Sequence, residues 1–114
     1  MIKIYHNPRC RKSREGLEYL ENSGEPFEVV RYLDNVPTMD ELATLIEYLG
    51  IPPEALVRKN EAIWKEQFKG KNLSDSEIIE AMVQHPKLIE RPIIVKDKKA
   101  VIGRPADKIS ILLD

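Results

Sequence analysis

The sequence predicts an α/β fold: a four-stranded mixed sheet flanked by helices, with a helical insertion between strands two and three. Three observations predict it. A strand–helix–strand pattern occupies residues 2–33, a block of helical patterns occupies about residues 38–90, and a hairpin pattern with a last helix follows. A chain of 114 residues is of single-domain size, so we expect one domain over residues 1–114.

The first pattern is a βαβ unit. Ile2–Tyr5 alternates in polarity and predicts a short strand. A helix beginning near Cys10 carries leucines toward a core, and Gly24 ends it, because glycine readily adopts the left-handed conformation found after a helix end. Phe27–Leu33 is rich in β-branched and aromatic residues and predicts a second strand, parallel to the first.

Two capping boxes mark helix starts within the insertion. Thr38 with Glu41, and Ser74 with Glu77, each combine a hydroxyl residue with a glutamate three positions later, so that each side chain accepts a bond from the other residue's backbone. Apolar residues follow both boxes at helical spacing. Shorter helical segments are expected from Pro53 and over Glu61–Phe68.

The last pattern is a hairpin followed by a helix. Arg91–Val95 and Ala100–Ile102 are apolar runs around the charged turn Asp97-Lys98-Lys99, which predicts two short antiparallel strands. Gly103-Arg104-Pro105 then leads into a final amphipathic helix, whose apolar residues are Ile109, Leu112 and Leu113.

The composition excludes several function classes. The net charge of −1 argues against nucleic-acid binding, which needs an excess of positive charge. No apolar stretch is long enough to span a membrane or to form a secretory signal, so we expect a cytoplasmic protein. One cysteine and two separated histidines make no convincing metal site, and we expect no bound cofactor. With one cysteine, any disulfide must join another molecule.

That cysteine, Cys10, falls where the first strand turns into the first helix. Free N–H groups and the helix dipole favour an anion at a helix N-terminus, and a thiolate is one. Nearby cations promote ionisation further; they are Arg9, Arg11, Lys12 and Arg14. Ser13, one helical turn along, can aim its hydroxyl at the sulfur or cap the helix. A lone cysteine is otherwise a small buried hydrophobe, but an Asn-Pro loop, His6 and charged neighbours are poor surroundings for an inert thiol.

Around Cys10 the sequence resembles the active-site loop of the glutaredoxin-coupled arsenate reductase family. The matching string runs from His6 to Arg14, and three further motifs match in order: Leu56–Asn60, Gln84–Ile93 and Gly103–Pro105. Together they cover nearly the whole chain. The resemblance implies a thioredoxin/glutaredoxin-like fold and a cis peptide bond between Arg91 and Pro92.

The resemblance also implies a mechanism. Cys10 would attack the arsenic of arsenate and form a covalent adduct, glutathione would join as co-substrate, and arsenite would leave. Glutaredoxin would then clear the mixed disulfide. Three arginines match the family's oxyanion-binding residues, namely Arg58, Arg91 and Arg104. Arginine suits this role because its paired donors hold oxyanions without deprotonation. Taken singly, each would be read as a surface ion-pairing residue in a chain with 19 acidic residues.

Supporting roles are expected for His6, Asn7, Ser13 and Arg14. His6 resembles the family's histidine before the cysteine loop, where it would either lower the thiol pKa as a positive imidazole or hold the loop by hydrogen bonds. It is equally compatible with a plain turn residue. Arg11 and Lys12 depart from the family pattern, which usually has small residues after the cysteine, so the substrate could differ.

Two other thiol chemistries each require a residue that this chain lacks. The phosphatase-type reductases need an arginine at position 16, where Gly16 stands, and a dithiol mechanism needs a second cysteine at position 13, where Ser13 stands. Two alternatives stay open. One is a monothiol glutathione-dependent oxidoreductase acting on disulfides, and the other is a non-enzymatic member of the fold that binds a protein partner.

Overall fold

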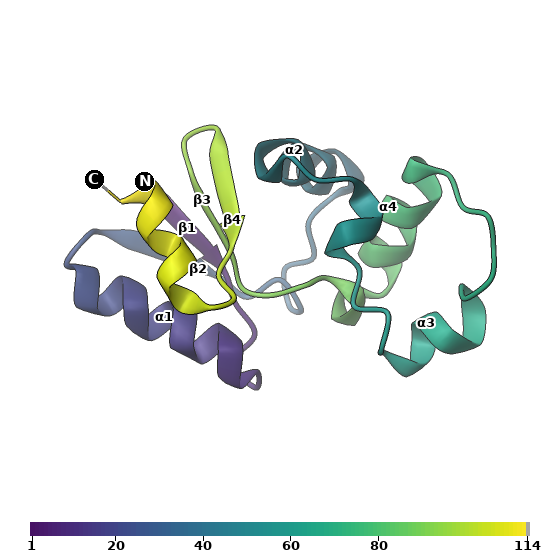
Figure 1. The fold of residues 1–114 in the computed structure, drawn as a ribbon, viewed down its shortest axis with the longest axis horizontal. Helices are drawn as coiled ribbons and strands as arrows, with labels where there is room; N and C mark the ends of the chain where they lie inside the picture. The colour runs from purple at the N-terminus through teal and green to yellow at the C-terminus, as the bar shows by residue number, and fades with distance from the viewer. Residues whose placement is uncertain (114) are drawn as a thin grey trace. The chain divides into compact units, whose positions relative to one another are not determined.

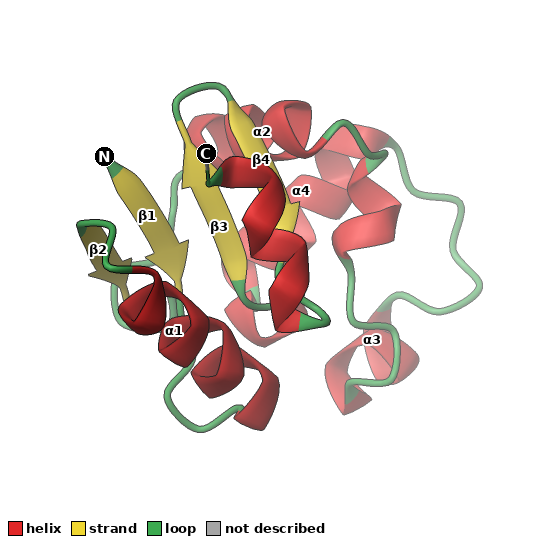
Figure 2. Cartoon of the chain, turned by 60° about the vertical axis from the view of Figure 1, so that its left-hand side comes forward, coloured by secondary structure: helices red, strands yellow, loops and turns green. Residues whose placement is uncertain are grey.

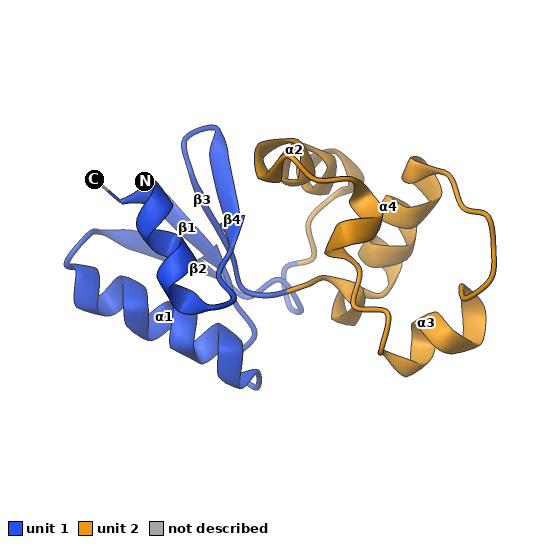
Figure 3. Cartoon of the chain, viewed as in Figure 1, with its two compact units in different colours: residues 1–35, 91–114 blue, residues 36–90 orange. Residues whose placement is uncertain are grey.

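The computed structural model describes residues 1–113. The chain divides into two compact units (Figure 3). The first unit contains residues 1–35 and the chain from residue 91 onward, and the second contains residues 36–90. The helical insertion expected at about residues 38–90 falls on the second unit.

The first unit contains the sheet (Figures 1 and 2). Its elements, in chain order, are β1 (Ile2–Tyr5), α1 (Arg11–Ser23), β2 (Phe27–Val30), β3 (Ile93–Lys96), β4 (Lys99–Ile102) and the 3₁₀ helix η3 (Ala106–Leu112). The strand order is β2-β1-β3-β4. β1 is parallel to β2 and antiparallel to β3, and β3 is antiparallel to β4. The predicted four-stranded mixed sheet is therefore confirmed.

The second strand is shorter than the sequence predicted. It ends at Val30, whereas the apolar run predicted a strand to Leu33. After Val30 the chain turns, because the carbonyl of Arg31 accepts hydrogen bonds from the N–H groups of Asp34 and Asn35 at 3.0 and 2.9 Å. The turn takes Tyr32 out of the sheet, although its side chain is almost fully buried. Tyr32 is therefore apolar because its side chain is buried, although the residue pairs with no neighbouring strand.

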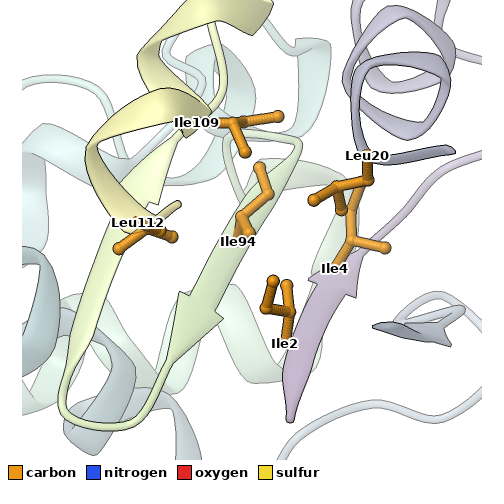
Figure 4. Close-up of a cluster of buried hydrophobic side chains, with 6 residues drawn as sticks. All are labelled: Ile2, Ile4, Leu20, Ile94, Ile109 and Leu112. Carbon is orange, nitrogen blue, oxygen red and sulfur yellow. The ribbon is translucent and has the colours of Figure 1, made fainter. Parts of the chain in front are cut away.

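One face of the sheet carries the core of this unit. Ile4 of β1 lies directly opposite Ile94 of β3 in the antiparallel register, so both side chains point to the same face. Leu20 of α1 and Ile109 of η3 cover this face, and all four are fully buried (Figure 4). Because α1 is fixed on this core, its N-terminus is held at the carboxyl end of β1.

The last helix is of 3₁₀ type rather than an α-helix. Its buried side chains, Ile109 and Leu112, are three residues apart. A 3₁₀ helix has three residues per turn, so residues at this spacing lie above one another on one face. The amphipathic pattern was correct, but it does not distinguish the two helix types over so short a segment.

The second unit is helical. It contains α2 (Met39–Leu49), η1 (Pro53–Leu56), α3 (Ala62–Gln67), α4 (Asp75–Gln84) and η2 (Pro86–Leu88). Both predicted capping boxes are confirmed, with hydroxyl and carboxylate accepting from each other's backbone at the starts of α2 and α4. Over residues 1–113, no helix combines the length and the apolar character that crossing a membrane requires.

Candidate active site

The loop that presents Cys10 is a β-turn, and the types of its residues favour that turn. The carbonyl of Asn7 accepts a hydrogen bond from the N–H of Cys10 at 3.0 Å, with Pro8 and Arg9 between them. Proline favours the second position of such a turn and asparagine the first. The Asn7 side chain adds a bond, since its Oδ1 accepts from the N–H of Arg9 at 3.0 Å. The turn delivers Cys10 to the N-cap of α1.

A buried group of polar side chains lies beneath this turn. Ser13 is fully buried in the first turn of α1, and its Oγ lies 2.7 Å from Nδ1 of His6. The same Oγ accepts a hydrogen bond from the N–H of Asn7 at 3.0 Å. His6 is also tied to β2, because its N–H donates to the carbonyl of Val30 at 2.8 Å. These bonds join β1, β2 and α1 around the loop.

The pKa of the Cys10 thiol is lower than the ordinary value. Partial burial alone would raise it, because burial disfavours the thiolate. The Arg91 guanidinium outweighs this effect by hydrogen-bonding to the sulfur and by its charge, together with the N–H groups of Ser13 and Lys12. The predicted nucleophile is thus poised to ionise.

The Ser13 hydroxyl does not follow the direction expected from the sequence. Its hydrogen bonds go to His6 and Asn7, and it is the backbone N–H of Ser13 that faces the Cys10 sulfur. Ser13 therefore supports the loop with its side chain and the thiolate with its main chain.

The pKa of His6 is lower than its usual 6.5. Burial is the largest cause, and the positive charges of Arg31 and Arg14 lower it further, against an opposing effect of the hydrogen bond with Ser13. His6 is therefore neutral at pH 7. Of the two roles considered for this residue, holding the loop by hydrogen bonds fits a neutral imidazole, and charge stabilisation of the thiolate does not.

Arg91 reaches Cys10 because of the segment that follows it. The Arg91–Pro92 peptide bond is cis, and the Pro92 ring is fully buried. A Cβ added to Gly16 would lie 2.8 Å from Cγ of Pro92, and one added to Gly103 would lie 3.2 Å from the same atom. The proline ring therefore packs against two positions that have no side chain. This packing fixes the start of β3 beside α1.

The two other arginines predicted to bind an oxyanion differ in their placement. Arg104 lies near Arg91, since its Nη1 donates to the Arg91 carbonyl at 3.3 Å. Arg58 lies in the second unit, where its Nη1 is 2.9 Å from Glu90 Oε1 and its Nε is 3.7 Å from Glu61 Oε2. Its expected oxyanion-binding role stays a prediction.

Arg14, expected to support the site, has a structural contact of its own. Its Nη1 donates to the carbonyl of Pro8 at 3.0 Å. This bond ties the first turn of α1 to the β-turn, and Arg14 as a whole is exposed.

Sequence reasoning missed three features. The Arg104–Pro105 bond is also cis, and no local signal distinguishes it from an ordinary trans bond. Gly16 had a signal, because a glycine inside a helical pattern costs stability unless close packing requires it. Arg31 was read only as part of a strand.

Among the described residues, no cluster of three or more histidine, cysteine or acidic side chains is placed to hold a metal ion.

Comparison with known proteins identifies the family of this chain. An arsenate reductase of Neisseria meningitidis is 40% identical over 114 residues, covering 98% of this chain and 97% of the relative. The Escherichia coli protein YfgD, which is uncharacterised, is 44% identical and covers 95% of this chain and 92% of its own length. The solved structure of an arsenate reductase from Vibrio cholerae superposes with a TM-score of 0.94 at 44% identity, covering 98% and 97% of the two chains. Residues 5–112 match the ArsC family, and the chain therefore belongs to that family.

Proposed function

We propose that this chain is a cytoplasmic arsenate reductase that uses Cys10 as its nucleophile and takes electrons from glutathione and glutaredoxin. The observation that carries the proposal is the contact between the Arg91 guanidinium and the Cys10 sulfur at the N-terminus of α1, which lowers the thiol pKa. A single site thus supplies a thiolate and a cation, the two groups that reaction with an oxyanion needs. Two of the relatives named above are arsenate reductases.

The reaction has two covalent stages. The Cys10 thiolate attacks the arsenic atom, an S–As bond forms, and one arsenate oxygen leaves as water after protonation. The thiolate of glutathione then attacks the Cys10 sulfur of the adduct. An S–S bond forms and the S–As bond breaks with its electron pair kept on arsenic, which departs as arsenite and leaves a mixed disulfide between Cys10 and glutathione. A glutaredoxin thiol attacks this disulfide and restores the Cys10 thiolate.

Positive charge is needed because both the nucleophile and the substrate are anions. Arg91 can offset the repulsion from the position it already holds beside the sulfur. Arg104, bonded to the Arg91 carbonyl, is the second proposed oxyanion ligand. Arg58 is the third, on the basis of the motif match. Its guanidinium pairs with Glu90 and Glu61, so we expect an incoming anion to replace one of these carboxylates.

A coupled assay tests the proposal. NADPH oxidation is followed with glutathione, glutaredoxin and glutathione reductase, with and without arsenate, for wild type, Cys10→Ser and Arg91→Ala. Lys98→Gln is the matched control, because Lys98 is an exposed cation in the turn between β3 and β4, at the sheet edge opposite the Cys10 loop.

We expect arsenate-dependent oxidation in the wild type and in Lys98→Gln, none in Cys10→Ser, and a fall of at least about tenfold in Arg91→Ala. The opposite result is a wild type with a reactive thiol and no arsenate-dependent oxidation. That result would contradict arsenate reduction, and reduction of a glutathione mixed disulfide in the same assay would point to the disulfide-reductase alternative.

A further inference from the structure

Arg31 lies beside the reactive loop although it is far from it in sequence. The parallel ladder between β1 and β2 ends with Tyr5 opposite Val30, and the N–H of His6 donates to the Val30 carbonyl. Arg31 is the next residue, so it follows β2 at the end of the sheet where the Cys10 loop follows β1. Neighbouring strands are about 4.8 Å apart, which places Arg31 close to His6. Burial is the largest cause of the lowered pKa of His6, and the positive charge of Arg31 lowers it further.

Arg31 and Arg91 flank the loop from opposite sides. β2 and β3 are the two neighbours of β1, and β3 is antiparallel to it with Tyr5 opposite Ile93. Arg91 is two residues before Ile93. It therefore lies at the same end of the sheet as Arg31, on the other side of β1. The side occupied by Arg91 is the side proposed for the oxyanion. The other side offers a separate cation to a second substrate.

The Arg31 guanidinium is available to such a ligand. Its side chain is exposed, and within residues 1–113 it forms no hydrogen bond or ion pair. Its main chain, in contrast, is fixed by the bonds from Asp34 and Asn35 to its carbonyl. The position is held while the side chain is free, which suits a residue that binds a carboxylate by paired N–H donors.

We propose that Arg31 binds a carboxylate of glutathione as the tripeptide approaches or leaves the Cys10 sulfur. This assignment rests on the proposed function, and it adds a subsite for the thiol co-substrate on the β2 side of the loop. Glutathione carries two carboxylates on a body too large to share the oxyanion position beside Arg91. A carboxylate subsite across the loop lets it reach the sulfur while the oxyanion position remains filled.

Thiol–disulfide exchange tests this subsite without arsenate. The Cys10 thiolate attacks one sulfur of oxidised glutathione, the new bond joins Cys10 to that glutathione, and the other glutathione leaves as a thiolate. The same attack on bis(2-hydroxyethyl) disulfide involves no carboxylate. Rates with both disulfides are measured by mass spectrometry of the intact protein for wild type, Arg31→Gln, Arg31→Lys and the control Lys98→Gln.

We expect Arg31→Gln to slow the reaction with oxidised glutathione by about two- to fivefold, the range of an exposed ion pair, and to leave the neutral disulfide unchanged. Arg31→Lys keeps the charge, and we expect its rate with oxidised glutathione to lie between the rates of wild type and Arg31→Gln. In the arsenate assay, Arg31→Gln should raise the KM for glutathione and leave the KM for arsenate unchanged.

Three results would overturn the assignment: equal slowing with both disulfides, no slowing with either, or the same slowing in Lys98→Gln. Failure of the proposed function gives a different pattern, because a wild type inactive on arsenate would still show the charge-dependent ratio of the two exchange rates. The subsite and the arsenate chemistry are thus tested separately.

Discussion

The Nδ1 atom of His6 lies 2.7 Å from the Oγ atom of Ser13, and both side chains are buried. His6 follows β1 directly and Ser13 lies in the first turn of α1, so this one bond spans the β-turn that carries Cys10. The N–H of Asn7 donates to the same oxygen. The turn is therefore held at both ends by one hydroxyl group.

Replacing Ser13 by alanine removes that hydroxyl and leaves the main chain intact. His6 Nδ1 and the Asn7 N–H lose a buried partner, so we expect the free energy of unfolding to fall by about 1–3 kcal/mol in urea titrations. The backbone N–H of residue 13 still faces the sulfur, so the thiol pKa should change little. Ser76→Ala, at an exposed position of α4, is the control. A large rise in the thiol pKa of Ser13→Ala would show that the hydroxyl itself stabilises the thiolate.

Replacing Arg91 by alanine should affect the thiol more than any other single change near it. The guanidinium provides both a hydrogen bond and a charge that lower the Cys10 pKa, and burial opposes them. With Arg91 gone, burial remains, and we expect the thiol pKa to rise. The pH dependence of alkylation by iodoacetamide measures it. Arg91→Lys keeps the charge and should lose only part of the effect; an unchanged alkylation profile in Arg91→Ala would contradict the contact.

Local sequence signals predicted the fold because they agree with one another. Each of these signals depends on side chains or backbone preferences within a few residues. The structure contains all of them: the capping boxes at Thr38 and Ser74, Gly24 after α1 and the turn at Asp97. The two wrong secondary-structure predictions fall where one sequence pattern is compatible with two structures. Tyr32 is apolar because it is buried outside the sheet, and the final pattern fits a 3₁₀ helix as well as an α-helix.

The sequence singled out candidate site residues, but it did not show how they are arranged. The sequence placed Cys10 at a helix N-terminus, where the structure has it. It did not show that the Ser13 hydroxyl bonds to His6, because the partner depends on how β1 meets α1. It did not single out Arg31 either, because that residue reaches the site only through strand pairing. Contacts made across strands have no signature in a single sequence.

Acid should destabilise the chain through His6. Its pKa is lower in the folded chain than the usual 6.5, so the unfolded chain binds more protons between these two values. The free energy of unfolding therefore falls as the pH drops through 6.5, and the loss is complete below the folded pKa.

Urea unfolding of wild type and His6→Asn from about pH 7.5 to about pH 5 measures this effect. His85 and the carboxylates are present in both proteins, so the difference between the two curves reports His6. We expect the variant to be less stable at neutral pH and to show a flatter curve below it. Two parallel curves would mean that His6 has the same pKa in the folded and the unfolded chain.

Gly16→Ala tests whether the packing of Pro92 controls the thiol. Alanine is the better helix former by about 1 kcal/mol, so in an open position the change would stabilise α1. Here the new Cβ would lie 2.8 Å from Cγ of Pro92, a buried ring atom that cannot rotate away as the end of a flexible side chain could. Such overpacking costs about 1–3 kcal/mol, and we expect a net loss of stability.

The displacement should also reach the active site. Pro92 follows Arg91, so a shifted ring moves the guanidinium relative to Cys10 and raises the thiol pKa without removing any charge. Urea titration and the iodoacetamide profile are both measured, with Glu18→Ala at an exposed position of the same helix as the control. A Gly16→Ala protein as stable as wild type, with the same alkylation profile, would show that the ring yields to a methyl group and that its contact with α1 does not set the position of Arg91.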